Sequence, residues 1–264
     1  MFAFKKRREF VLLLSLTTVL GWTVWTGCSK KSTEPEPSQP TADYLAPKAA
    51  DAPVIDGQAD DACWEAAEWA GIDYLWLGEG EADPDDFSGR YKIVWTETKL
   101  CFLIEITDDE LSDVYDDPLQ NYWMDDCLEI FIDEDHSGGD HQCNTNAFAY
   151  HISQFYDAVD LGGVGCVPVL YSDHLHVMRT HAGTLHTWEV AMDVYTAAYS
   201  DLLGTDSPKA ELKANKLIGF ANAYCDDDGG GVREHFYGST AIPGADKNLA
   251  WQDASVFGDL LLVE

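Results

Sequence analysis

Short runs of apolar residues, separated by turns rich in Gly and Asp, constrain what this chain can fold into. The clearest run is residues 127–133. Successive side chains of a strand point to opposite faces, which places Leu128, Ile130 and Ile132 on one face. Glu129 then projects from the other face, either into solvent or toward a ligand. Alternation over such a short run predicts a β-strand rather than a helix.

Comparable runs recur through the rest of the chain, and each of them predicts a strand. They cover residues 91–95, 100–106, 148–155, 175–179, 187–192, 218–225, 234–237 and 260–263. Residues 60–69 favour a short helix. Many short strands joined by Gly and Asp turns are typical of an all-β chain. The predicted fold is therefore an antiparallel β-sandwich, jelly-roll-like, with few short helices.

The N-terminal residues 1–27 have the pattern of an export signal. A basic head at residues 5–8 precedes an apolar run at residues 10–20 and then small residues. The tripeptide that ends at Cys28 resembles the lipobox of bacterial lipoproteins, which implies that Cys28 is lipidated. Ser29 after it favours the outer membrane or the cell surface. The alternative is an ordinary signal peptide with a chance cysteine.

Residues 28–50 are rich in Ser, Thr, Glu and Pro. Such a segment buries too little apolar surface to offset its ordering entropy, so a flexible tether is predicted here. Residues 51–264 form the predicted sandwich, expected to be a monomeric domain.

The net charge of the chain excludes several classes of binding partner. The chain has 16 Lys and Arg against 47 Asp and Glu, a formal net charge of −31. Such a surface repels phosphate backbones and anionic lipid, so we expect no nucleic acid and contact with a membrane only through the lipid anchor. Neutral ligands are unaffected, and cations such as calcium are attracted.

Six further cysteines follow Cys28, and none of them forms a C-x-x-C pair. Export permits disulfides, and we expect one or two, with the pairing left open. These cysteines are Cys63, Cys101, Cys127, Cys143, Cys166 and Cys225. Buried free thiols are the alternative.

Four segments, in order, resemble the family 9 carbohydrate-binding modules of the DOMON-like superfamily. Pro53-Val-Ile-Asp-Gly57 resembles the start of that family. Residues 92–102 and 123–133 resemble its central strands, and 248–262 resemble its closing segment. The resemblance implies a sandwich that binds sugars without cleaving them.

The same resemblance implies a set of ligand-binding residues. Trp123 and Trp251 match two indole rings that clamp a terminal sugar, Glu129 matches an acid between them, and Asn248 matches an amide. Indole rings cover the apolar faces of a pyranose, while carboxylate and amide groups bind its hydroxyls. Without the resemblance, the core is the favoured place for the two Trp, and Glu129 fits a solvated strand position equally well.

One strand departs from the family pattern. Ala149 and His151 stand where the family carries Arg and Asn. His151, as a neutral ring, is predicted to bind a sugar hydroxyl. This departure leaves the identity of the sugar open. It also leaves a second alternative for the whole protein, a scaffold lipoprotein with a degenerate sugar site.

Acidic turns predict structural calcium, which the resemblance also implies. The first candidate set is Asp133, Asp135 and Asp140 around a Gly turn, because hard cations take several oxygen ligands. Residues 226–231 and 108–110 are further candidates. Ordinary solvated turns are the alternative.

No catalytic motif is present: the sequence has no G-x-S-x-G, no H-E-x-x-H and no P-loop. The prediction is a non-catalytic surface lipoprotein that binds a neutral mono- or oligosaccharide or the end of a polysaccharide. A haem-binding, electron-transferring DOMON-type domain is the alternative from another class, and it would need an axial Met.

Overall fold

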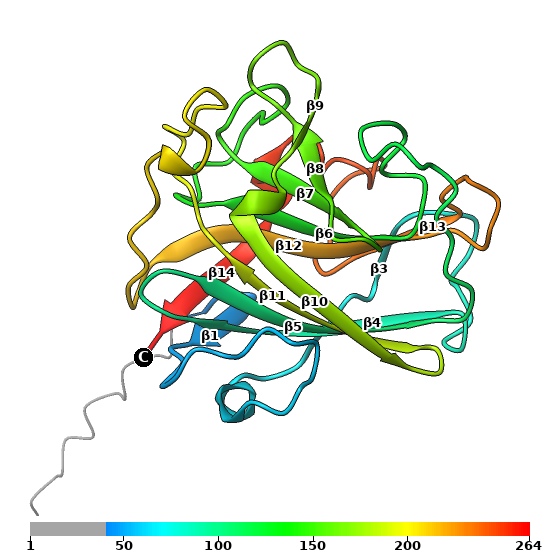
Figure 1. Cartoon of the computed structure of the whole chain (residues 1–264), viewed down its shortest axis with the longest axis horizontal. Coiled ribbons are helices and arrows are strands. Elements are labelled where there is room, and N and C mark those ends of the chain that lie inside the picture. The colour runs from blue at the N-terminus through cyan, green and yellow to red at the C-terminus, as the bar shows by residue number, and fades with distance from the viewer. Residues whose placement is uncertain (1–40) are drawn as a thin grey trace, which may run out of the picture. The chain divides into compact units, whose positions relative to one another are not determined.

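The computed structural model describes residues 41–264, which fold as one unit of two β-sheets (Figure 1). The larger sheet has nine strands. They are β1 (Tyr44–Pro47), β3 (Tyr74–Leu77), β6 (Cys127–Asp133), β7 (Phe148–Ser153), β8 (Ala158–Leu161), β9 (Pro168–Leu170), β12 (Leu217–Asp226), β13 (His235–Gly238) and β14 (Gly258–Val263). The main path of this sheet runs β1-β14-β12-β6-β7-β8-β9, and β13 pairs with β12 and β3.

The smaller sheet has five strands in the order β10-β11-β5-β4-β2. Their bounds are β2 (Ala70–Gly71), β4 (Phe87–Trp95), β5 (Leu100–Asp108), β10 (Leu175–Ala182) and β11 (Leu185–Met192). The helices of residues 41–264 are short 3-10 turns at Ala62–Ala66, Ser172–His174, Gly204–Asp206 and Ala254–Val256. The predicted all-β sandwich is confirmed, and the helix expected within residues 60–69 is the first of these turns.

The main core lies between the two sheets. Leu128, Ile130 and Ile132 of β6 are buried in it, together with Phe102 and Ile104 of β5. Burying one such side chain contributes about 1.5–3 kcal/mol. The predicted assignment of faces on β6 is therefore confirmed, and its other face is free to build a site.

That other face of the large sheet carries a second, smaller cluster. Phe131 and Phe236 pack there among Ala149, Ala221 and Ala223. Phe131 on β6 lies between Ala149 on β7 and Ala221 on β12, so its ring is flanked by small side chains.

The start of the folded domain differs from the prediction. β1 pairs in parallel with β14, with Tyr44 opposite Leu260. The Tyr44 hydroxyl donates to the Glu68 carbonyl at 2.7 Å and accepts from the Ile93 amide at 2.9 Å. The predicted tether, residues 28–50, is therefore wrong in its last residues, because β1 belongs to the sheet. A strand of four residues beside a Pro-rich stretch is too short to give a periodic signal.

The predicted signal peptide, residues 1–27, and the lipidation site Cys28 lie outside the described residues. Within residues 41–264, no helix has the length and apolarity that a membrane span requires.

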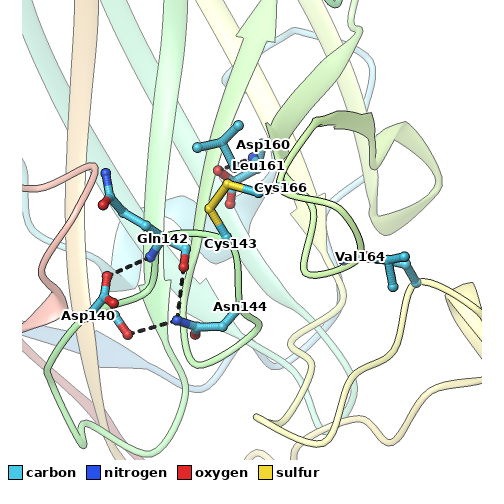
Figure 2. The surroundings of a disulfide bond; sticks show 9 residues. Asp140, Gln142, Cys143, Asn144, Asp160, Leu161, Val164 and Cys166 are labelled. Carbon is cyan, nitrogen blue, oxygen red and sulfur yellow. Dashed lines mark hydrogen bonds between the residues drawn. A yellow bond between two sulfur atoms is a disulfide. The ribbon is translucent and has the colours of Figure 1, made fainter.

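One disulfide joins Cys143 to Cys166, which meets the expectation of one or two (Figure 2). It ties the loop between β8 and β9 to the loop that precedes β7. The other cysteines of the described chain, Cys63, Cys101, Cys127 and Cys225, are free thiols.

Candidate functional site

A pocket of about 440 Å³ opens on the outer face of the large sheet. All five residues predicted to bind sugar line it. The lining residues are Tyr122, Trp123, Glu129, His151, Leu161, Pro168, Arg233, Phe236, Asn248 and Trp251. The structure therefore brings together side chains from segments that are more than 120 residues apart in the sequence.

The sheet supplies the floor of this pocket and the loops supply its walls. Glu129 on β6 lies directly opposite His151 on β7, and Ala223 on β12 lies opposite Glu129 on the other side. Trp123 lies in the turn that leads into β6, and Trp251 lies in the loop between β13 and β14. Strands thus fix Glu129 and His151, while turns present the two indoles.

Glu129 is almost fully buried, at 1% exposure, and its carboxylate contacts cations. Its Oε1 lies 3.1 Å from Nε2 of His151 and 3.7 Å from Nη1 of Arg233. Burial alone would raise the pKa of Glu129, but the charge and hydrogen bond of His151 and the charge of Arg233 hold that pKa below its ordinary value. The alternative of a solvated Glu129 is wrong. Glu129 is a buried carboxylate at the floor of the pocket.

Oε2 of Glu129 has no hydrogen-bond partner among the described residues. A buried carboxylate oxygen that lacks a donor is costly, so a ligand hydroxyl that donates to it would be favoured.

His151 faces an acceptor on each side of its ring. Nδ1 lies 2.9 Å from the Ala149 carbonyl, and Nε2 faces Glu129. Both nitrogens therefore carry protons, and the ring is a cation. Burial would lower the pKa of His151, but the Glu129 carboxylate outweighs it and raises that pKa. Both nitrogens are engaged within the protein, which does not favour the predicted neutral ring, and a role of His151 in binding a sugar hydroxyl stays a prediction. His151 holds Glu129 in its ionised form.

The aromatic rings of the pocket are accessible. Trp251 is 39% exposed and Trp123 is partly exposed, so neither is sealed in the core. Tyr122 packs edge-on against both Trp123, at 4.9 Å between ring centroids, and His151, at 4.8 Å. Tyr122 thereby supports the Trp123 indole and connects it to the charged floor.

Sequence reasoning missed five lining residues: Tyr122, Leu161, Pro168, Arg233 and Phe236. Arg233 is the most consequential, because it brings a guanidinium to Glu129 and packs over Phe236 at 4.1 Å. Two signals could have found it. Arg233 is one of only 16 Lys and Arg residues in a very acidic chain, and it lies two residues after a run of glycines.

With this geometry established, the chain can be compared with known proteins. Residues 55–264 match the carbohydrate family 9 binding domain-like family. The chain belongs to this family. Among curated proteins nothing matches.

Solved structures of the family share the fold. A family 9 module from Caldicellulosiruptor kristjanssonii in complex with cellotriose is 16% identical, with a TM-score of 0.59, over 83% of this chain and 93% of that one. The glucose complex is 17% identical, with a TM-score of 0.58, over 83% and 95%. A Bacteroides uniformis protein is 13% identical, with a TM-score of 0.53, over 83% and 97%.

In this family 9 module the acids predicted to bind calcium accept hydrogen bonds in two separate turns. Oδ2 of Asp133 accepts from the Gly138 amide, and Oδ1 of Asp135 accepts from the Ser137 amide. Asp140 instead caps the turn beside the disulfide, where its Oδ1 accepts from the Gln142 amide (Figure 2). Within residues 41–264, groups of three or more metal-ligating side chains with ligand atoms within 4.8 Å of one another occur elsewhere. Asp133, Asp135 and Asp140 thus accept hydrogen bonds within local turns, while Oδ1 of Asp133 is buried without a partner among the described residues, and calcium binding by this set stays a prediction.

A different acidic cluster does form: Asp108, Asp126 and Asp226 are all buried, with oxygens within 4.8 Å of one another. Asp108 and Asp226 come from the two further segments predicted for calcium, and Asp126 was missed. Burial first, and then the charge of Asp108, raise the pKa of Asp126 to about 9 and that of Asp226 to about 8. Three buried carboxylates that repel one another suit a hard divalent cation.

The haem alternative would need an axial methionine beside the pocket. Among the described residues that line it there is no methionine. Met192, one of the methionines considered, is buried in the core between the sheets.

Proposed function

We propose that this chain binds a neutral sugar, or the end of a glycan, in the pocket above Glu129 and does not cleave it. The observation that carries the proposal is that two solvent-accessible indoles, a buried carboxylate and an amide converge on one pocket. The family supports the class of ligand, and the two Caldicellulosiruptor modules bind cellotriose and glucose.

Each part of the pocket suits one part of a pyranose. Trp123 and Trp251 cover its apolar C–H faces as a clamp, which provides dispersion and desolvation. Glu129 accepts hydroxyl hydrogens, and each charge-assisted hydrogen bond contributes about 1.5–3 kcal/mol. Asn248 offers both a donor and an acceptor. The volume of about 440 Å³ lies within the range of small-molecule pockets, which is enough for a sugar or a chain end.

The acidic residues that line the pocket argue against glycoside hydrolysis. Hydrolysis of a glycoside uses two carboxyl groups, one of them a general acid with a raised pKa. Among the lining residues of the described chain, Glu129 is the single acid, and its pKa is lowered. Such a group remains a hydrogen-bond acceptor throughout and donates no proton, as a binding role requires.

Calorimetric titration of the full chain with glucose and cellotriose, after a glycan array, tests the proposal. We expect saturable binding to at least one neutral glycan. Glu129→Gln should weaken it by about 1–2 kcal/mol, and Glu97→Gln, in an exposed turn, should leave it unchanged. Failure to bind any neutral glycan would favour the scaffold lipoprotein with a degenerate site.

We further propose that calcium binds the acidic cluster of Asp108, Asp126 and Asp226 as a structural ion. The Tyr224 hydroxyl and the Asp227 amide orient this cluster through hydrogen bonds to Asp108 (2.6 Å) and Asp126 (2.7 Å). Calcium would supply the positive charge that these three carboxylates otherwise lack.

For its location, we propose a lipid anchor at Cys28 in the outer membrane or at the cell surface. Mass spectrometry of the N-terminal peptide checks this, with Cys28→Ser as the variant expected to leave the membrane fraction. A Cys28→Ser protein that stays in the membrane fraction would contradict it.

A further inference from the structure

Two free cysteines lie side by side beneath the sugar pocket. Cys127 on β6 is directly opposite Cys225 on β12 in an antiparallel pair. Directly opposite residues of such a pair have Cα atoms about 4.5–5.5 Å apart, inside the range that a disulfide spans. Their sulfurs and an oxygen of Glu129 all lie within 4.8 Å of one another. The backbone thus already has the spacing that a cross-link needs.

The thiol of Cys225 is hydrogen-bonded to the Glu129 carboxylate in the sugar pocket. Cys225 Sγ donates to Oε1 of Glu129 at 2.9 Å, the same oxygen that His151 contacts. Arg233 Nη1 donates to Cys225 Sγ at 3.1 Å. A guanidinium in this position disfavours a metal ion between the sulfurs and the carboxylate, because the positive charge there is already supplied.

Cys127 lines a second pocket of about 230 Å³, which shares Tyr122 and His151 with the sugar pocket. Cys127 itself is buried, at 1% exposure, so access of a small reagent to its thiol requires local opening beside this pocket.

We propose that Cys127 and Cys225 form a dithiol–disulfide couple, and that its state tunes the affinity of the sugar pocket. An S–S bond forms between the two sulfurs, both thiol hydrogens leave, and a small-molecule disulfide takes them up as two thiols. Oxidation removes the hydrogen that Cys225 donates to Oε1 of Glu129. That oxygen then has a free lone pair for a sugar hydroxyl, so the oxidised form binds sugar more tightly. The effect on affinity rests on the proposed function, whereas the cross-link does not.

The cross-link is tested by peptide mapping of the full chain after folding with oxidised or reduced glutathione and alkylation of free thiols. We expect the oxidised sample to contain linked peptides of Cys127 and Cys225, with the mass of two hydrogens lost. Cys127→Ser should lack this link and retain Cys143–Cys166. Alkylation of both thiols in the oxidised wild-type protein would overturn the cross-link, and this readout needs no variant.

The effect on affinity is tested by titrating cellotriose into the oxidised wild-type chain and into Cys127→Ser under the same oxidising conditions. The variant keeps the Cys225 thiol and should bind about two- to tenfold more weakly, the fold-change of one hydrogen bond. Equal affinities would overturn the coupling to the pocket. Binding by neither protein would overturn the proposed function instead, while the mapped link would still support the couple.

Discussion

The pKa of a buried carboxylate is lowered in the sugar pocket and raised in the acidic cluster, although Glu129 and Asp126 are only three residues apart. Glu129 has two cationic neighbours, and its pKa is lowered. Asp126, three residues earlier, has acidic neighbours, and its pKa rises to about 9. Both groups are buried to the same extent, at 1% exposure. Neighbouring charge, rather than burial, therefore decides which carboxylate is ready for a neutral ligand and which one needs a cation.

The largest expected effect is a loss of stability when the positive charge beside the Glu129 carboxylate is removed. His151→Leu removes a cation from a buried carboxylate, so the free energy of unfolding should fall by about 3–5 kcal/mol. Denaturant unfolding measures this. The double variant His151→Leu with Glu129→Leu should recover much of the loss, because no uncompensated carboxylate remains. A double variant no more stable than the single one would contradict the account.

Calcium binding to the acidic cluster should have the next largest effect, an increase in stability. At a hundredfold excess over its dissociation constant, an ion contributes about 2.7 kcal/mol, which raises Tm by roughly 5–10 °C in a domain of this size. Scanning calorimetry with calcium and with chelator checks this. Asp126→Asn should lose most of the shift. A wild-type Tm that does not respond to calcium would contradict the calcium proposal.

The pH dependence of stability also distinguishes the acidic cluster from the sugar pocket. The raised pKa values of Asp126 (about 9) and Asp226 (about 8) mean that the folded protein binds more protons than the unfolded chain between the ordinary carboxyl range and pH 8–9. Without calcium, the cluster's contribution to stability therefore falls as pH rises through that window. Chelated wild-type protein should show this slope in denaturant unfolding, and Asp126→Asn should flatten it. An identical slope in both proteins would contradict the assignment.

The stabilisation by the His151–Glu129 pair is confined to a pH window. It is fully present between the ordinary Glu and His ranges, and it is lost as pH falls through the lowered pKa of Glu129 or rises through the raised pKa of His151. Arg233, Cys225 and Asp160 face the same pair. The stability that this pair contributes should be lost as pH rises through the pKa of His151. Proton NMR of the His151 ring across that range measures it.

The smallest effect concerns the loop between Leu161 and Pro168, two residues that line the pocket. The Cys143–Cys166 disulfide ties this loop to the loop before β7 (Figure 2). Cys166→Ser should weaken sugar binding by less than about 1 kcal/mol, through added loop freedom. Val164→Ala, an exposed change in the same loop, is the matched control. A loss of sugar affinity larger than that of Glu129→Gln would contradict this prediction, because the loop would then contact the ligand directly.

The strands were predictable because alternation is local: the run at residues 127–133 coincides with β6. The five sugar-site residues came from the resemblance to the family, and the fold brings all of them around one pocket. The sequence marks Arg233 as a rare basic residue, but its contact with Glu129 depends on how the segments beside β6 and β12 come together in the fold. The place of Asp126 in the acidic cluster depends on the same pairing. The charge of His151 likewise depends on the acceptors that its two nitrogens face, which no spacing reveals.

The central claim is that two indoles hold one sugar between them, and calorimetric titration of Trp123→Ala and Trp251→Ala tests it most directly. Trp69→Ala is the matched control, since Trp69 packs beneath Arg90 on the other sheet. The account predicts that both pocket variants lose detectable binding while they still unfold cooperatively, and that the Trp69 variant binds like the wild-type protein. Unchanged affinity in both pocket variants would contradict it.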